Sequence, residues 1–143
     1  LAAHVRPRPC LEEGRFLAAA SGVTSAIDVS DGLSSDLGHL AAGSGTGARI
    51  YGQKVPVSRE LRHFCGRFDF DPLEFALAGG EDYTLLFTVE ADKAETLEQG
   101  FREKFGSGFS ILGEMTDSGR AELVGTGGEV APLVPTGWDH FRT

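Results

Sequence analysis

The chain has 143 residues, 41% hydrophobic and 24% charged, which is enough to bury the core of one globular domain. Its 13 basic and 21 acidic residues give a net charge of −8, which argues against nucleic acid as a partner because a nucleic-acid backbone calls for a basic surface. No apolar run reaches the ~20 residues of a membrane span, and the cysteines at positions 10 and 65 lack the density of a disulfide scaffold, so we expect a cytoplasmic protein with no membrane partner.

The first twenty residues are predicted to hold an extended segment and one helix. Two prolines alternate with two arginines over residues 6–9, which is typical of a linker. Residues 12–20 can form a helix that ends at the Ser-Gly pair 21–22. A linker at the start of a chain that lacks an initiator methionine suggests that another segment precedes it. We therefore expect residues 1–20 to be an interdomain linker and first helix, and residues 21–143 to be the domain that follows.

The next stretch, residues 26–33, places two carboxylates and a hydroxyl where a strand meets a helix. Residues 26–29 have the apolar, β-branched composition of a short buried strand, and leucines at helical spacing begin at Leu33. Asp28 and Asp31 would repel a bare phosphate unless a hard divalent cation lies between them, and Mg²⁺ is the best fit. Since the free amides of a first helical turn favour an anion, the pattern points to a metal and a nucleotide.

The same residues have a simpler interpretation. Ser30 or Asp31 can cap the helix. Gly32 fits either interpretation, because a glycine is common in a turn and can also let a ligand approach the backbone. Asp-Gly after a strand is common turn chemistry, and a Ser-Asp pair before a leucine-spaced run is often only a helix cap without a ligand. This octapeptide alone does not decide between the two interpretations.

The rest of the chain is predicted to mix helices with strands. Helices are expected after Ser58, after Asp71 with a proline at the first helical position, and over residues 94–105. Strands are expected at residues 48–51, 83–89, 109–112, 121–124 and 129–134, the last two joined by a glycine-rich hairpin. Helices between the early strands and a late hairpin argue for an α+β fold with a mixed β-sheet and packed helices.

Two further segments carry candidate ligand-binding residues. Glu81 and Asp82 follow two glycines that leave the backbone open to a ligand, although the glycines can also be a plain helix C-cap with solvated acids. Trp138, the only tryptophan, follows a glycine near the chain end. It can cover the edge of the core, or its face can stack on a flat ring of a ligand.

The motifs together resemble the C-terminal domain of thiamine-monophosphate kinase, a family within the ATP-using enzymes similar to aminoimidazole ribonucleotide synthetase. The resemblance covers nearly the whole chain, in order. It rests on residues 28–33 (DVSDGL), 36–39 (DLGH), 78–83 (AGGEDY) and 137–141 (GWDHF), with residues 4–7 (HVRP) similar to the family's interdomain segment. It implies the fold of the C-terminal domain of those enzymes.

The resemblance implies a function as well. Thiamine-monophosphate kinase transfers the γ-phosphoryl group of ATP to thiamine monophosphate, gives thiamine diphosphate and needs Mg²⁺. By resemblance, Asp28 and Asp31 are magnesium ligands, Ser30 contacts the ATP phosphates, and Glu81 and Trp138 bind thiamine monophosphate. No residue of this chain is expected to be catalytic itself.

The family also has an N-terminal domain that carries most of the magnesium carboxylates, much of the nucleotide site and the dimer interface. We therefore expect a homodimer in the full-length protein and little or no activity in this chain alone. For the contact to thiamine monophosphate that the resemblance assigns to Glu81, Asp82 is the second choice. Two alternatives stay open: another superfamily member, such as a selenophosphate or aminoimidazole ribonucleotide synthetase or a hydrogenase-maturation protein, and a non-catalytic binding module.

Overall fold

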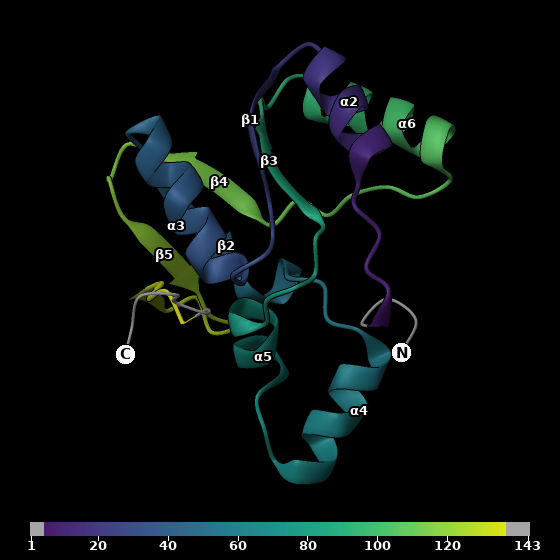
Figure 1. Ribbon diagram of the computed structural model, residues 1–143. Helices are drawn as coiled ribbons and strands as arrows, with labels where there is room; N and C mark the ends of the chain where they lie inside the picture. The colour runs from purple at the N-terminus through teal and green to yellow at the C-terminus, as the bar shows by residue number, and fades with distance from the viewer. Residues whose placement is uncertain (1–4, 137–143) are drawn as a thin grey trace.

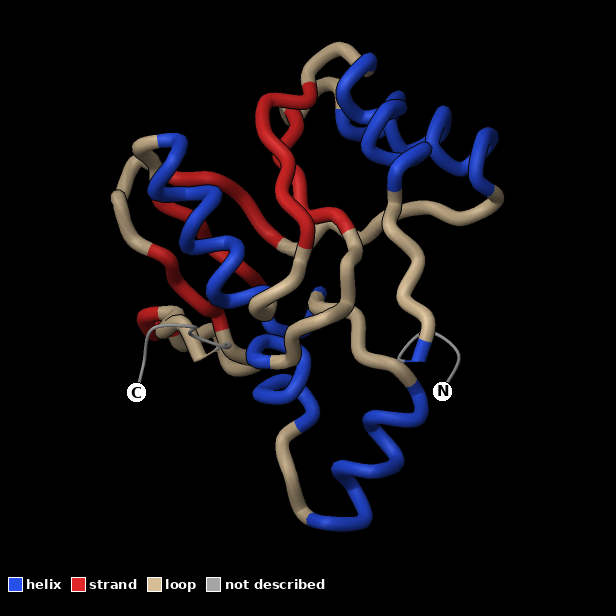
Figure 2. Tube along the Cα trace, in the orientation of Figure 1, coloured by secondary structure: helices blue, strands red, loops and turns tan. Residues whose placement is uncertain are grey.

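The computed structural model describes residues 5–136, in which helices and strands are interspersed along the chain (Figures 1 and 2). The elements in chain order are α2 (Leu11–Ala19), β1 (Val23–Asp28), α3 (Leu33–Ser44), β2 (Gly47–Tyr51), the 3-10 helix η1 (Gly52–Lys54), α4 (Arg59–Phe68), α5 (Pro72–Ala78), β3 (Leu85–Val89), α6 (Ala94–Phe105), β4 (Gly113–Thr116), β5 (Ala121–Val124) and β6 (Val130–Pro132). No helix in this part of the chain is long and apolar enough to span a bilayer.

The strands form two sheets. β1 and β3 make an antiparallel pair in which Asp28 lies opposite Leu85. The larger sheet has the order β4-β2-β5-β6, with β2 antiparallel to β4 but parallel to β5. This arrangement confirms the predicted α+β class with a mixed sheet.

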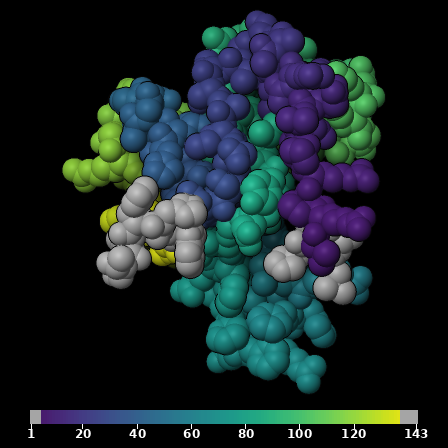
Figure 3. Space-filling view, viewed as in Figure 1, coloured from purple at the N-terminus to yellow at the C-terminus, as the bar shows by residue number. Residues whose placement is uncertain are grey.

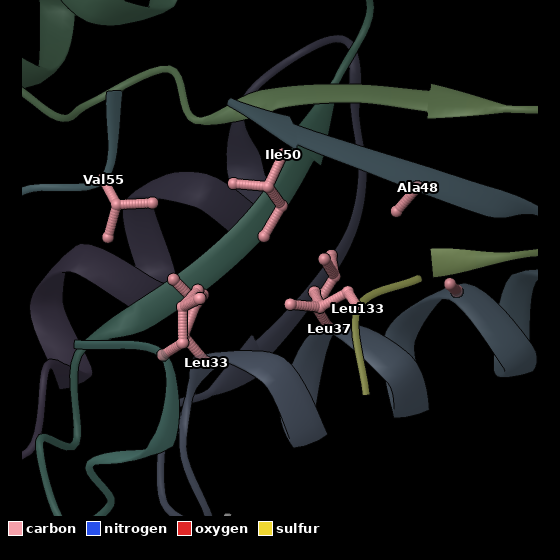
Figure 4. Close-up of a cluster of buried hydrophobic side chains, with 8 residues drawn as sticks. Leu33, Leu37, Ala48, Ile50, Val55 and Leu133 are labelled. Carbon is pink, nitrogen blue, oxygen red and sulfur yellow. The ribbon is translucent and has the colours of Figure 1, made fainter. Parts of the chain in front are cut away.

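The core lies between α3 and the larger sheet. Leu33, Leu37 and Ala41 recur at helical spacing on the buried side of α3, and Figure 4 shows the two leucines near Ala48 and Ile50 of β2. Burying one such aliphatic side chain stabilises the fold by about 1.5–3 kcal/mol. The core is completed by Val55, Leu77 and Leu133. Because α3 is held over this core, the position of its N-terminus is fixed.

The helices α2 and α6 pack together near one end of the β1–β3 pair (Figure 1). The Phe16 ring meets the edges of Phe101 and Phe105 at centroid distances of 5.8 and 5.7 Å. These edge-to-face contacts join the first described helix to a helix more than seventy residues later in the chain.

The helices α4 and α5 occupy the opposite end of the molecule, where α4 projects outward (Figure 3). Ser58 accepts a hydrogen bond of 3.1 Å from the Leu61 amide, and Asp71 accepts one of 2.8 Å from the Leu73 amide. Pro72 is the first helical residue of α5. Both predicted caps are therefore confirmed.

One predicted strand is wrong. Residues 109–112 form no strand, and β4 begins only after them. The Phe109 ring instead packs edge-on against Phe87 and Phe101, with centroids 5.0 and 5.7 Å away. Only the carbonyl of Leu112 joins the sheet's bonding, by accepting from the Tyr51 amide at 2.9 Å. Phe109 thus packs against β3 and α6, whereas Ile111 is 56% exposed. Periodicity cannot distinguish such a run from a short buried strand.

Two other predicted strands are shorter than expected. β3 begins at Leu85 because Tyr83, with φ of 50°, cannot continue a strand. β6 covers only Val130–Pro132, and its proline fits an edge strand because it has no amide to donate. The hairpin itself is confirmed, since β5 and β6 pair antiparallel.

Candidate functional site

The acidic turn (residues 28–32) lies beside the Glu81 loop (residues 79–84) because backbone hydrogen bonding continues past the β1–β3 pair. Val29 forms two backbone hydrogen bonds of 2.8 Å with the end of this loop, and the Ser30 carbonyl accepts a third of 2.8 Å from the Glu81 amide. Two motifs that are fifty residues apart in the sequence therefore meet directly before the first turn of α3.

Two glycines permit this close approach. A Cβ at Gly32, where φ is 109°, would lie 2.7 Å from the Ala78 carbonyl oxygen, and one at Gly80 would lie 2.5 Å from the Ser30 carbonyl oxygen. Neither distance leaves room for a side chain. The sequence interpretation assigned the open backbone at both glycines to a ligand, but in the structure it is filled by the neighbouring segment of the same chain.

The Glu81 loop carries unusual backbone conformations. Glu81 and Tyr83 have φ of 64° and 50°, in the left-handed region that non-glycine residues rarely adopt. Residues in such conformations cost about 1–3 kcal/mol each and are concentrated at functional sites. The amides of both residues donate to the acidic turn, so the same hydrogen bonds that join the two segments hold the strained loop in place.

The acidic turn is shaped by Asp36, a residue that we did not predict as part of the site. Asp36 is only 2% exposed, and its Oδ2 accepts hydrogen bonds from the Ser30 and Asp31 amides at 3.0 and 3.1 Å. The prediction that Ser30 or Asp31 caps α3 is wrong: the N-cap is Gly32, and no side chain caps this helix in the usual way. The sequence did contain a signal for Asp36, because it is a carboxylate in the first turn of α3 on the apolar side of that helix.

The site's carboxylates differ in environment. Asp28, Glu81 and Asp82 are exposed, whereas Ser30 and Asp31 are half-buried. Although Asp82 is exposed, nearby protein atoms partly desolvate its carboxyl and raise its pKa above the ordinary value of 3.8. Among residues 5–136, no ion pair includes Asp28 or Glu81. Both acids can therefore meet a ligand without first breaking an ion pair of the described chain.

The acidic turn fits Mg²⁺ as a partial set of ligands. Asp28 and Asp31 supply hard carboxylate oxygens, and no cluster of three or more His, Cys, Asp or Glu side chains that could hold a metal occurs in the described part. Mg²⁺ commonly uses one or two carboxylates, with water and phosphate oxygens completing its octahedron. The residues present therefore suit a cation that is shared with a phosphorylated ligand.

The end of the described chain returns to the same helix. The Thr136 amide donates a hydrogen bond of 3.2 Å to the hydroxyl of Ser34, which is 1% exposed and lies in the first turn of α3. Trp138, the predicted ring contact for the substrate, lies outside the described residues. The segment that leads to it is thus fixed beside the acidic turn as far as Thr136.

Two hollows on the described surface lie elsewhere. One, of about 550 Å³, is lined by Arg62, His63, Gly66 and Arg67 of α4, and the other, of about 210 Å³, includes Phe16 and Leu97 of the α2–α6 pair. Neither is lined by a predicted site residue. The candidate site is therefore defined by the junction of the two motifs.

The fold and a match to a family of domains place the chain in a known class. Residues 1–126 match the family described as AIR synthase related protein, C-terminal domain, and the chain belongs to this family. Solved structures of the hydrogenase maturation protein HypE share the fold. The Escherichia coli protein has a TM-score of 0.69 at 24% identity, over 85% of this chain and 38% of that chain.

Within this class, the chain is similar to thiamine-monophosphate kinases. It is 34% identical to that of Aquifex aeolicus (strain VF5) over 139 residues and 39% identical to that of Escherichia coli (strain K12) over 141 residues. These matches cover 96% and 98% of this chain but 40% and 42% of the relatives. The structure of AaThiL complexed with AMPPCP and TMP has a TM-score of 0.75 at 30% identity, over 98% of this chain and 40% of that one.

These matches confirm the resemblance to thiamine-monophosphate kinase that the sequence motifs indicate. The chain spans about two fifths of the length of its curated relatives, for example 42% of the Escherichia coli protein. Whatever the remaining three fifths of such a protein contribute lies outside this chain.

Proposed function

We propose that this chain is the C-terminal, ligand-binding domain of a thiamine-monophosphate kinase. The complete enzyme would transfer the γ-phosphoryl group of ATP to thiamine monophosphate and form thiamine diphosphate, with Mg²⁺ required. The proposal is supported by the kinase relatives at 34–39% identity and by a similar structure complexed with AMPPCP and TMP.

The observation that carries the proposal is the hydrogen bond of 2.8 Å between the Ser30 carbonyl and the Glu81 amide. It joins the segment proposed to hold metal and ATP phosphates to the segment proposed to hold thiamine monophosphate. A phosphoryl transfer requires that donor and acceptor be held side by side and in line, and most of its catalysis comes from such positioning.

Each residue has a defined part in this scheme. Asp28 and Asp31 would hold Mg²⁺, and the Ser30 hydroxyl would donate a hydrogen bond to an ATP phosphate. Glu81 would accept a hydrogen bond from thiamine monophosphate, and Trp138 would pack against one of its rings. When bound, Mg²⁺ neutralises the charge that two polyanions bring together. The attacking phosphate oxygen is already ionised at neutral pH, so no residue of the chain need act as a strong base.

The architecture of the whole enzyme follows from the same proposal. Residues 1–20 would link an N-terminal domain to residues 21–143, and that domain would supply further magnesium ligands and the contacts of a homodimer. We place the enzyme in the cytoplasm, in keeping with two free cysteines and biosynthetic relatives. The isolated chain would fold but turn over little or no substrate.

The test is formation of thiamine diphosphate from ATP, Mg²⁺ and thiamine monophosphate. The chain is assayed alone and within a polypeptide extended to the length of its relatives, and activity is expected only in the extended protein. There, Asp31→Asn should abolish turnover, whereas Glu60→Gln, which changes an exposed acid in the first turn of α4, should not. Turnover by the chain alone at the rate of the extended protein would contradict the division of the site between domains.

A lack of thiamine diphosphate in both samples would favour another ATP-using member of the superfamily, and a screen of phosphorylated substrates would then follow. Absence of ATP and Mg²⁺ binding in the extended protein would instead favour a non-catalytic module. The acidic turn argues against that module, because clustering two carboxylates without a cation is electrostatically unfavourable.

A further inference from the structure

We propose that Asp36 is the positioning residue of the site, whose buried carboxylate fixes the acidic turn and, through it, the Glu81 loop. The contact to ATP and Mg²⁺ that this positioning serves rests on the function proposed above. The inference itself rests on the burial of Asp36, on its two hydrogen bonds and on the junction that they support.

The first argument is the placement of a charge where it is costly. Asp36 is 2% exposed, and a carboxylate removed from water is tolerated only if hydrogen bonds replace its hydration. Its Oδ2 receives two such bonds from backbone amides, and bonds of this kind to an ionised acceptor are among the stronger ones. The position in the first turn of α3 also favours a negative charge.

The second argument is the direction of these bonds. An ordinary capping side chain precedes the helix and accepts from amides within it. Asp36 lies inside the helix and accepts from Ser30 and Asp31, which precede it. The bonds therefore do not satisfy amides of α3; they fix the backbone of the two residues proposed to contact ATP and Mg²⁺.

The third argument is that Ser30 is held from both sides. Its amide donates to Asp36 at 3.0 Å, and its carbonyl accepts from Glu81 at 2.8 Å. Gly80 packs against the same carbonyl, where even a Cβ would be only 2.5 Å away. A shift of Ser30 would thus displace the strained Glu81 loop as well, so one carboxylate controls both halves of the site.

The experiment compares two substitutions of similar size with the wild-type chain. Asp36→Leu removes the acceptor, and Asp36→Asn removes the charge but keeps an oxygen that can accept both amides. Glu60→Gln, an exposed first-turn acid of α4, is the matched control. Amide hydrogen exchange is followed residue by residue in nitrogen-15-labelled protein, and Mg²⁺ alone is titrated while the amide shifts of Asp28 and Asp31 are recorded.

In Asp36→Leu we expect faster exchange at Ser30, Asp31 and Glu81, with α6 unchanged, and Mg²⁺ affinity weaker by about tenfold, as for lost outer-shell partners of metal ligands. Asp36→Asn should stay close to wild type in both measurements, and that rescue separates positioning from charge. Unchanged exchange at Glu81, or unchanged Mg²⁺ affinity in Asp36→Leu, would overturn the proposal.

The remaining outcomes are also decisive. If Asp36→Leu does not fold, the wild-type and Asp36→Asn chains decide. Fast amide exchange at Ser30 and Asp31 in the wild type would overturn the proposal. So would an Asp36→Asn chain that binds Mg²⁺ as weakly as the Asp28→Asn chain. If the wild-type chain shows no saturable response to Mg²⁺, the titration is repeated with ATP in the extended protein, which carries the remaining proposed ligands. No response there overturns the metal part of the proposed function, and exchange at Glu81 then decides whether Asp36 positions the loop. Failure of the kinase assay with intact Mg²⁺ binding would overturn the proposed reaction only.

Discussion

Glu81 combines an exposed carboxylate with a left-handed backbone conformation, φ 64°. Glycine adopts this conformation without steric cost, so Glu81→Gly should raise the free energy of unfolding by about 1 kcal/mol. The same change should abolish binding of thiamine monophosphate in the extended protein, because the carboxylate is lost. Urea unfolding measures the first effect and calorimetric titration the second.

The control for this prediction is Glu81→Gln, which keeps the strain and the side-chain length. It should weaken binding of thiamine monophosphate without stabilising the fold. A gain of stability in Glu81→Gln equal to that in Glu81→Gly would show that charge, and not backbone strain, limits stability at this position.

Asp82 should make the stability of the fold depend on pH. Its pKa is raised by desolvation, so the folded state holds the proton more tightly than the unfolded state, whose pKa is near 3.8. Stability is therefore lost as pH rises from 3.8 through the folded pKa. Asp82→Asn should melt at a higher temperature than wild type at pH 7, and the difference should vanish well below pH 3.8. A difference that is constant with pH would contradict this account.

At the scale of residues, chemical type selected some members of the candidate site and not others. Asp28, Ser30 and Asp31 could be selected from the sequence because carboxylates and a hydroxyl at a strand-to-helix turn have a known chemistry. Asp36 could not be selected, because its partners are backbone amides whose positions depend on the folded turn. The expected side-chain cap at Ser30 or Asp31 was wrong for the same reason.

Among the elements, the junction of the acidic turn and the Glu81 loop depends on the missing side chain of Gly80. Gly80→Ala would place a Cβ 2.5 Å from the Ser30 carbonyl oxygen, a backbone atom that cannot move cheaply. We expect a loss of roughly 1–3 kcal/mol in the free energy of unfolding and faster amide exchange at Glu81. Gly66→Ala is the control.

Gly66 lies inside α4, and a Cβ there would meet nothing within 4 Å. Alanine at this position should stabilise the chain by roughly 0.5–1 kcal/mol, since glycine is a poor helix former. The two substitutions are chemically identical and should have opposite signs. Chemical denaturation of both variants tests this, and equal effects would contradict the close approach at Gly80.

The pairing of α2 with α6 depends on Phe16 and its edge-to-face contacts with Phe101 and Phe105. Phe16→Ala should lower the free energy of unfolding by about 2 kcal/mol, less than for a fully buried phenylalanine. It should also speed amide exchange in α2 before the rest of the chain. Leu11→Ala, at a residue 66% exposed on the same helix, should change little. If Phe16→Ala lowers the free energy of unfolding as little as Leu11→Ala does, α2 lies outside the cooperative unit.

The helices were predictable because caps and apolar spacing are local signals. The start of α5 after Asp71 and of α4 after Ser58 agree with the sequence prediction to the residue. The strand expected at residues 109–112 was wrong, because whether a short apolar run pairs or packs depends on distant partners such as Phe87. β4, with Gly113 and Glu114 in it, has little local β signal and was missed.

At the scale of the whole molecule, the contact between the two motifs required the three-dimensional fold. The sequence predicted each motif separately and left open whether the glycines before Glu81 were only a helix end. The antiparallel pairing of β1 with β3 brings the motifs together, and such long-range pairing leaves no mark in either segment. The acidic turn and the Glu81 loop become one site only through that pairing.

The net charge of −8 gives the whole chain a general attraction for cations, from which a specific magnesium site must be distinguished. General attraction is screened at high ionic strength, whereas carboxylates that coordinate a cation directly keep most of their affinity. Asp28→Asn should therefore weaken, by about tenfold, only the Mg²⁺ binding that persists in 0.5 M salt. Because Asp28 is exposed, the free energy of unfolding should change by less than ~0.5 kcal/mol. Asp117→Asn removes the same charge from an exposed turn and should leave the Mg²⁺ binding in 0.5 M salt unchanged. Equal effects of the two variants would mean that the acidic turn attracts Mg²⁺ only through the charge of the whole molecule.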